Sequence, residues 1–117
     1  MRKLSTHVLD TAQGRPAAGM KIELWRLGGP TPHRLAETRT NADGRTDAPL
    51  LTGETLESGS YELVFHVAAY FRACGVPVGD PAFLNEVPIR FGVAEDDAGY
   101  HVPLLCSPWA YSTYRGS

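Results

Sequence analysis

The sequence has few cysteines, no excess of basic residues and no long hydrophobic run. Its two cysteines, Cys74 and Cys106, form no CxxC pair, so we expect buried, reduced thiols rather than a disulfide framework. Lys and Arg total 11 against 13 Asp and Glu, and the basic residues are scattered, which argues against a nucleic-acid partner. No apolar stretch is long enough for a signal peptide or a membrane span, so we expect no membrane association and a cytoplasmic location.

Glycine and proline are spread along the chain: 12 Gly and 9 Pro separate short runs in which apolar and polar residues alternate. Alternation with period two predicts β-strands. We expect strands at 3–9, 20–27, 33–40, 60–67, 85–93, 100–107 and 110–114, with a further short one at 48–51. Turn signals recur about every eight to twelve residues, which predicts an all-β sandwich in a single domain, 1–117.

One segment breaks the alternation. Residues 68–74, "AAYFRAC", are rich in alanine and are followed by Gly75. Alanine favours helix, and glycine is the commonest residue just after a helix end. The sequence therefore predicts one short helix between two strands.

Two histidines are the first candidates for chemistry. In 3–9 the apolar face carries Thr6 and Val8, so His7 points to the other face together with Ser5. In 100–107 the apolar face carries Val102, so His101 also points away from the core. The alternation leaves two interpretations open, solvent-facing histidines or a pair of imidazoles that transfer protons near neutral pH.

Arginine and the last residues are the next candidates. Arg45 follows the turn "NADG", and its guanidinium could bind a carbonyl, an enolate or a carboxylate, although a solvated arginine is the commoner case. Arg115 has the same two interpretations. Ser117 would add a hydroxyl and an α-carboxylate at the same place if the tail is ordered.

Other residues are weaker candidates. His33 and His66 lie on strand-like runs without the spacing of a zinc site, so we expect no metal. Ser107 and Ser112 lack the motif of a nucleophilic serine. Trp25 and Trp109 are more typical of a core or an interface than of a ligand platform.

Three segments, "LSTHVLDTAQGRPAAG", "NADGR" and "YHVPLLCSPWAYSTYRGS", resemble transthyretin-like proteins of the 5-hydroxyisourate hydrolase type. The resemblance extends from residue 4 to residue 117. The terminal "YRGS" is the feature that separates the hydrolases from the hormone carriers of the same fold.

This resemblance implies a transthyretin-like β-sandwich of two four-stranded sheets with one short helix. It implies a homotetramer with active sites where two dimers meet, no cofactor, and hydrolytic opening of the ring of 5-hydroxyisourate. The catalytic residues would be His7, Arg45, His101 and Ser117, and the substrate would be bound by Tyr114, Arg115 and Gly116. Which histidine acts as the base stays open at this point.

Two other classes remain as alternatives. A transthyretin-fold carrier of small ligands would use the same channel without catalysis, but an apolar channel does not need His7, Arg45 and His101. A structural sandwich domain would present an exposed apolar edge and no polar cluster. We expect the hydrolase, in which the tail ends inside the channel.

Overall fold

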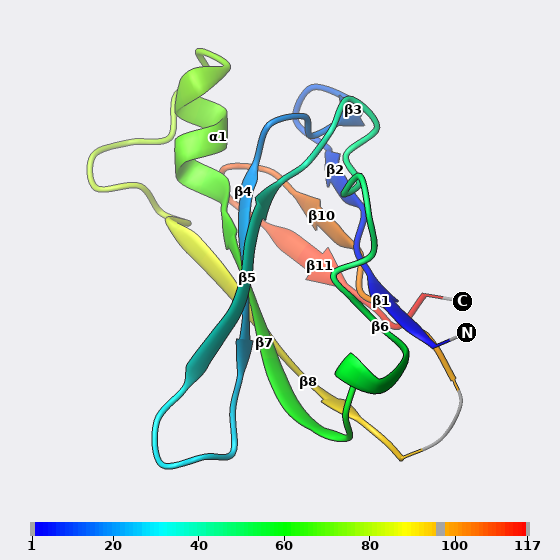
Figure 1. Ribbon diagram of the computed structural model, residues 1–117. Helices are drawn as coiled ribbons and strands as arrows, with labels where there is room; N and C mark the ends of the chain where they lie inside the picture. The colour runs from blue at the N-terminus through cyan, green and yellow to red at the C-terminus, as the bar shows by residue number, and fades with distance from the viewer. Residues whose placement is uncertain (1, 96–97, 117) are drawn as a thin grey trace.

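The computed structural model describes residues 2–95 and 98–116, which form two layers of strands with one helix at an end of the sandwich (Figure 1). The first layer is an antiparallel sheet in the order β5-β4-β7-β8. Its strands are β4 (Lys21–Arg26), β5 (His33–Arg39), β7 (Gly59–His66) and β8 (Glu86–Val93). The predicted alternation of β7 is confirmed, because Tyr61, Leu63 and Phe65 are fully buried. Each such side chain contributes about 1.5–3 kcal/mol of burial energy.

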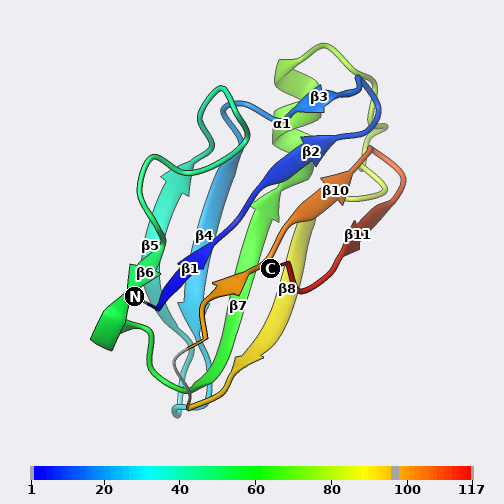
Figure 2. The same cartoon turned by 90° about the vertical axis from the view of Figure 1, so that its right-hand side faces the viewer.

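The second layer consists of a four-stranded and a three-stranded sheet. The four-stranded sheet has the order β11-β10-β2-β3 and the three-stranded sheet the order β6-β1-β9. Figure 2 shows β1 running on into β2, and β10 lying beside β2. The strands are β1 (Lys3–Ser5), β2 (Val8–Asp10), β3 (Arg15–Pro16), β6 (Leu51–Thr52), β9 (Tyr100–His101), β10 (Leu104–Cys106) and β11 (Tyr111–Thr113).

The strands predicted at 3–9 and 100–107 are therefore each interrupted. Pro103 has no N–H, so a continuous hydrogen-bond ladder cannot pass through it. On the neighbouring strand, the Val8 N–H donates to the carbonyl of Gly44, in a loop, at 2.8 Å. The interruption places His7 between β1 and β2, where its side chain is half-buried.

Helix α1 (Val67–Ala73) confirms the predicted helix and its glycine end. Gly75 has a φ of +77°, which glycine adopts readily. The Val76 N–H donates to the Phe71 carbonyl and the Gly75 N–H to the Arg72 carbonyl, which is the Schellman pattern. A short 3-10 helix, η1 (Gly53–Thr55), follows β6.

Both cysteines are free thiols, but the expectation that both are buried is wrong for Cys74. Cys106 is fully buried, and burial raises the pKa of its thiol to about 12, so it stays protonated. Cys74 is only half-buried, because it caps the end of α1, where the chain turns away. Among the described residues there is no helix with the length and hydropathy needed to cross a membrane.

Candidate active site

His7 is held by the loop that precedes Arg45. Its Nε2 lies 2.8 Å from the carbonyl oxygen of Asp43, and the next residue, Val8, bonds to the carbonyl of Gly44. The loop is thus joined to the break between β1 and β2 by two hydrogen bonds. This arrangement fixes the ring of His7 on the outer face of the second layer.

The loop itself is a tight turn built by Asn41. The Asn41 side-chain oxygen accepts from the N–H groups of Asp43 at 2.9 Å and of Arg45 at 3.2 Å. Gly44 has a φ of +77°, and a Cβ there would lie 2.3 Å from the carbonyl oxygen of Val8. Only glycine allows the loop to approach the strand so closely, and this approach brings the exposed Arg45 to the site.

His101 lies beside Ser5, because β1 and β9 are parallel neighbours in which these two residues are partners. The Ser5 Oγ is 2.8 Å from the Nδ1 of His101. Burial lowers the pKa of His101 below its ordinary value of 6.5, and the nearby Arg45 and His7 lower it further. The imidazole is therefore kept neutral near pH 7.

The tail, residues 114–116 of the described chain, lies beside His101. The Gly116 N–H donates to the His101 carbonyl at 2.8 Å, and the two residues form an isolated β-bridge. A Cβ on Gly116 would lie only 2.5 Å from the His101 Cδ2, so the imidazole packs against the bare backbone. The glycine of "YRGS" is required by this contact. Ser117, the last predicted residue, lies outside the described residues.

Arg115 contacts Tyr100, and Tyr114 lies beside it in the same groove. The Arg115 guanidinium stacks over the Tyr100 ring at 4.2 Å from its centroid, and it donates to the Gly99 carbonyl at 3.4 Å. Both residues line a groove of about 660 Å³ between the tail and β8, whose walls are Ile89, Arg90, Phe91, Gly92, Val93, Ala94, Tyr100, Val102 and Thr113. The structure thus gathers His7, Arg45, His101 and Gly116, while Tyr114 and Arg115 line the adjoining groove.

Sequence reasoning did not assign a role to Ser5 or to the Asp43 carbonyl. Ser5 could have been found, because the alternation places it on the same face as His7. Its contact with His101 depends on the pairing of two strands that are 96 residues apart, which a single sequence does not specify.

A second histidine cluster lies on the outer face of the other layer. His66 has no useful spacing in the sequence, yet its Nε2 is 2.6 Å from a Glu23 oxygen and 3.7 Å from a Glu86 oxygen. The three residues come from adjacent strands and could together hold a metal ion. Spacing within the sequence did not indicate these two partners of His66, because they lie on other strands.

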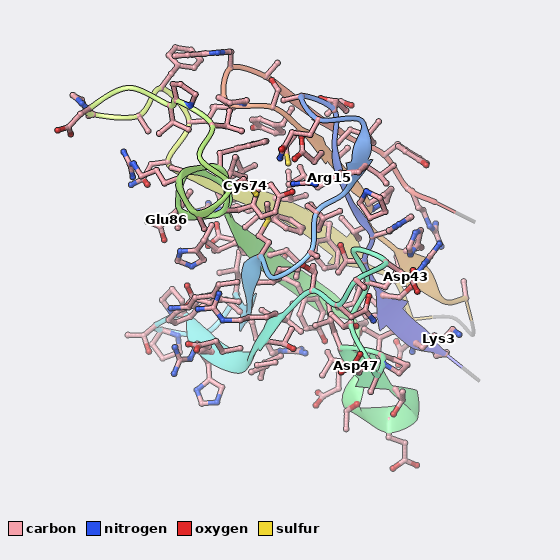
Figure 3. The ribbon with its side chains drawn as sticks, turned by 90° about the horizontal axis from the view of Figure 1, so that it is seen from above. Lys3, Arg15, Asp43, Asp47, Cys74 and Glu86 are labelled. Carbon is pink, nitrogen blue, oxygen red and sulfur yellow. The ribbon has the colours of Figure 1, made fainter. Side chains whose placement is uncertain are left out.

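An arginine partly neutralises the negative charge of this cluster. Arg34 lies 3.6 Å from Glu23, and the bond from His66 lowers the pKa of the Glu23 carboxyl. We interpret the cluster as an ion-pair network that ties β4 to β7 and β8. In Figure 3, Glu86 and Asp43 lie on opposite sides of the molecule, so this cluster is separate from the site at His7.

Comparison with known proteins identifies the family of the chain. Residues 4–116 match the family model described as HIUase/Transthyretin family. The protein named 5-hydroxyisourate hydrolase 2 of Rhizobium meliloti (strain 1021) is 59% identical over 115 residues, which are 98% of this chain and 96% of that protein.

Solved structures show the same fold. The structure of Klebsiella pneumoniae 5-hydroxyisourate hydrolase matches with a TM-score of 0.83 and 36% identity over all of both chains. Transthyretin from Sparus aurata matches with a TM-score of 0.88 over 99% of this chain and 97% of its own, but at 24% identity it supports the fold alone. The predicted transthyretin-like sandwich is confirmed, and the chain belongs to the HIUase/Transthyretin family.

Proposed function

We propose that the chain catalyses the hydrolytic ring opening of 5-hydroxyisourate, a step of urate breakdown, to 2-oxo-4-hydroxy-4-carboxy-5-ureidoimidazoline. The observation that carries the proposal is the grouping of two imidazoles, His7 and His101, with Arg45 on one outer face. The relative at 59% identity bears the name of this hydrolase. No cofactor is invoked, because hydrolysis of a cyclic amide requires only proton transfer and stabilisation of an oxyanion.

The reaction begins when water attacks the C6 carbonyl of the substrate. One histidine removes a proton from that water, and negative charge develops on the carbonyl oxygen. Arg45, an exposed guanidinium beside the two rings, stabilises this charge. A well-placed donor of this kind is worth about 2.7–4 kcal/mol in the transition state. The ring C–N bond then breaks and the departing nitrogen receives a proton.

The tail supplies the remaining contacts in this proposal. Gly116 brings the backbone against His101, while Tyr114 and Arg115 line the groove beside it. We assign Tyr114, Arg115 and Gly116 to substrate binding, and Ser117 to holding the substrate or the water.

The site is further proposed to lie between dimers of a homotetramer. Large apolar side chains are exposed on a single chain, among them Phe83 (68%), Trp109 (59%), Tyr111 (45%) and Tyr114 (60%). Phe83 and Trp109 are neighbours, with ring centroids 6.2 Å apart. Sedimentation velocity tests this assembly, since the tetramer has four times the chain mass of 12.7 kDa. A cytoplasmic location stays a prediction from the sequence.

The alternative of a small-ligand carrier has one supporting feature, the largely apolar groove beside β8. It does not account for the Gly44 approach, which brings Arg45 to the histidines, or for the packing of Gly116 on His101. The hydrolase explains both features.

A spectroscopic assay tests the proposed function. 5-Hydroxyisourate is generated freshly from urate with urate oxidase, and its ultraviolet decay is followed with and without a trace of the protein. We expect decay far faster than the spontaneous rate, lost in His7→Asn and retained in His33→Gln, a control at an exposed histidine that begins β5. Unchanged decay with the intact, folded protein would contradict the proposal and favour the carrier.

A further inference from the structure

The two histidines have different hydrogen-bond partners, and these partners determine which nitrogen of each ring carries a proton. For His7 the partner of Nε2 is the backbone carbonyl of Asp43, at 2.8 Å. A carbonyl oxygen only accepts, so the Nε2 of His7 must carry the proton. Neutral His7 therefore presents the lone pair of Nδ1, which can take a proton from water.

For His101 the partner is a hydroxyl. The Ser5 Oγ lies 2.8 Å from Nδ1, and within 2–95 and 98–116 this is the one hydrogen bond that the Ser5 hydroxyl makes. A hydroxyl can donate or accept, and when the Ser5 hydroxyl donates to Nδ1, that nitrogen carries no proton of its own. The proton of neutral His101 then lies on Nε2.

The orientation of the His101 ring is restricted on two further sides. Gly116 packs against Cδ2, and the backbone is fixed by the bond from the Gly116 N–H to the His101 carbonyl. On the other side, the Val102 N–H donates to the Ser5 carbonyl at 2.9 Å, which holds the serine beside the ring. Nε2 is thus the nitrogen left to face a substrate.

We infer that Ser5 is a positioning residue that holds His101 with its proton on Nε2, so that His101 donates a hydrogen bond to the substrate carbonyl while His7 carries the mobile proton on Nδ1. This inference rests on the proposed hydrolysis. His7 takes a proton from the attacking water, the new C–O bond forms, and negative charge develops on the carbonyl oxygen. His101 and Arg45 stabilise that charge, as neutral imidazole donors do elsewhere.

Both proton transfers of the reaction pass through His7 alone. When the tetrahedral intermediate collapses, the ring C–N bond breaks, and the proton on Nδ1 passes to the departing nitrogen. The hydroxyl of water ends on the carbonyl carbon and its proton on the nitrogen, so both histidines return to their starting state. His101 never has to release its Nε2 proton, which a neutral imidazole gives up very reluctantly.

Nuclear magnetic resonance tests the tautomers without an activity assay. In protein labelled with ¹⁵N at histidine, the shifts of the two ring nitrogens report which one is protonated. We expect Nε2–H in both His7 and His101 of the wild-type protein, and a mixture of tautomers at His101 in Ser5→Ala. A proton on Nδ1 of His101 in the wild type would overturn the inference whether or not the protein is a hydrolase.

Kinetics test the catalytic consequence. Ser5→Ala is expected to lower kcat roughly tenfold with little change in KM, the size expected for loss of one hydrogen bond. Ser5→Thr keeps the hydroxyl and is expected to retain kcat within about threefold. Ser60→Ala, at an exposed serine of β7, is the matched control.

A Ser5→Ala enzyme with unchanged kcat would overturn the role of Ser5. Should this variant fail to fold, the wild-type tautomers still decide the inference. If the wild type shows no hydrolysis, the proposed function fails, and the tautomers then test the placement of the proton separately.

Discussion

His101 and His66 lie on the outer faces of opposite layers, and their neighbours differ in charge. His66 stands between two carboxylates, Glu23 at 2.6 Å and Glu86 at 3.7 Å. His101 has a hydroxyl on Nδ1, while the guanidinium of Arg45 places positive charge near it. Carboxylate neighbours hold a histidine in a structural network, whereas burial and a cationic neighbour lower the pKa of His101 and keep its ring neutral.

The difference teaches that exposure and alternation alone do not separate a structural histidine from one proposed to be catalytic. Both rings point away from the core, and both come from strands with regular patterning. What separates them is the chemistry of the neighbours that strand pairing brings together. The following predictions test this distinction, from the largest expected effect to the smallest.

Replacing Arg45, the cation of the proposed active site, is expected to have the largest effect. Arg45→Gln should lower kcat/KM about a hundredfold or more, because the oxyanion loses a charged donor. The Arg45 side chain is exposed, so the free energy of unfolding should change by less than about 0.5 kcal/mol. Arg39→Gln on β5 is the control, measured by steady-state kinetics and urea denaturation. Equal losses of activity in the two variants would contradict the role of Arg45.

A methyl group on the tail is expected to have the next largest effect. Gly116→Ala places a Cβ 2.5 Å from the His101 Cδ2, so the ring or the tail must move. Misplacement on this scale should lower kcat roughly tenfold to a hundredfold. Gly29→Ala is the control, because a Cβ there meets only the Thr31 carbonyl at an ordinary 3.6 Å. Normal kcat in Gly116→Ala would show that the packing on His101 is dispensable.

Removing the other histidine should affect stability and leave catalysis intact. His66→Gln weakens the network to Glu23 and Glu86, at an expected cost of about 1 kcal/mol in the free energy of unfolding. The value of kcat should be that of the wild type, since the cluster lies on the opposite side of the molecule (Figure 3). Urea denaturation and the ultraviolet assay measure the two quantities. A large loss of activity at unchanged stability would reverse the assignment of the two clusters.

The two clusters should also lose stability in different pH ranges. The lowered pKa of His101 means that the unfolded chain binds this proton more readily, so folding is disfavoured as pH falls below 6.5. The lowered pKa of Glu23 stabilises the fold above its ordinary value of 4.5, and this contribution is lost as pH falls below that value. Urea denaturation from pH 8 to pH 5 should therefore show a smaller decline in His101→Asn than in the wild type. An identical decline would contradict the shift at His101.

Much of the fold follows from local patterns in the sequence. Alternation in 60–67 predicts the buried face of β7, and Gly75 predicts the end of α1, because both depend on neighbouring residues alone. The same alternation predicts that His7 and His101 point away from the core. The interruptions at His7 and Pro103 were not predicted, although proline gives a reason for one of them.

The parts of the site that were not predicted from the sequence all depend on contacts between distant segments. Ser5 reaches His101 across a parallel strand pair, and Gly44 meets Val8 through a loop that returns from the other layer. Glu23, His66 and Glu86 come from three strands. The stacking of Arg115 on Tyr100 likewise requires the path of the tail. Patterns within one strand carry no information about such contacts.

One measurement tests the central claim most directly, namely that catalysis belongs to the cluster of His7, Arg45 and His101, and ion pairing to the cluster of Glu23, His66 and Glu86. The decay of freshly generated 5-hydroxyisourate is followed with the wild type, His101→Asn and His66→Gln, each at pH 8 and each confirmed as folded. We expect the wild type and His66→Gln to accelerate the decay equally, and His101→Asn to be at least a hundredfold slower. Full activity in His101→Asn, or equal losses in both variants, would contradict the account.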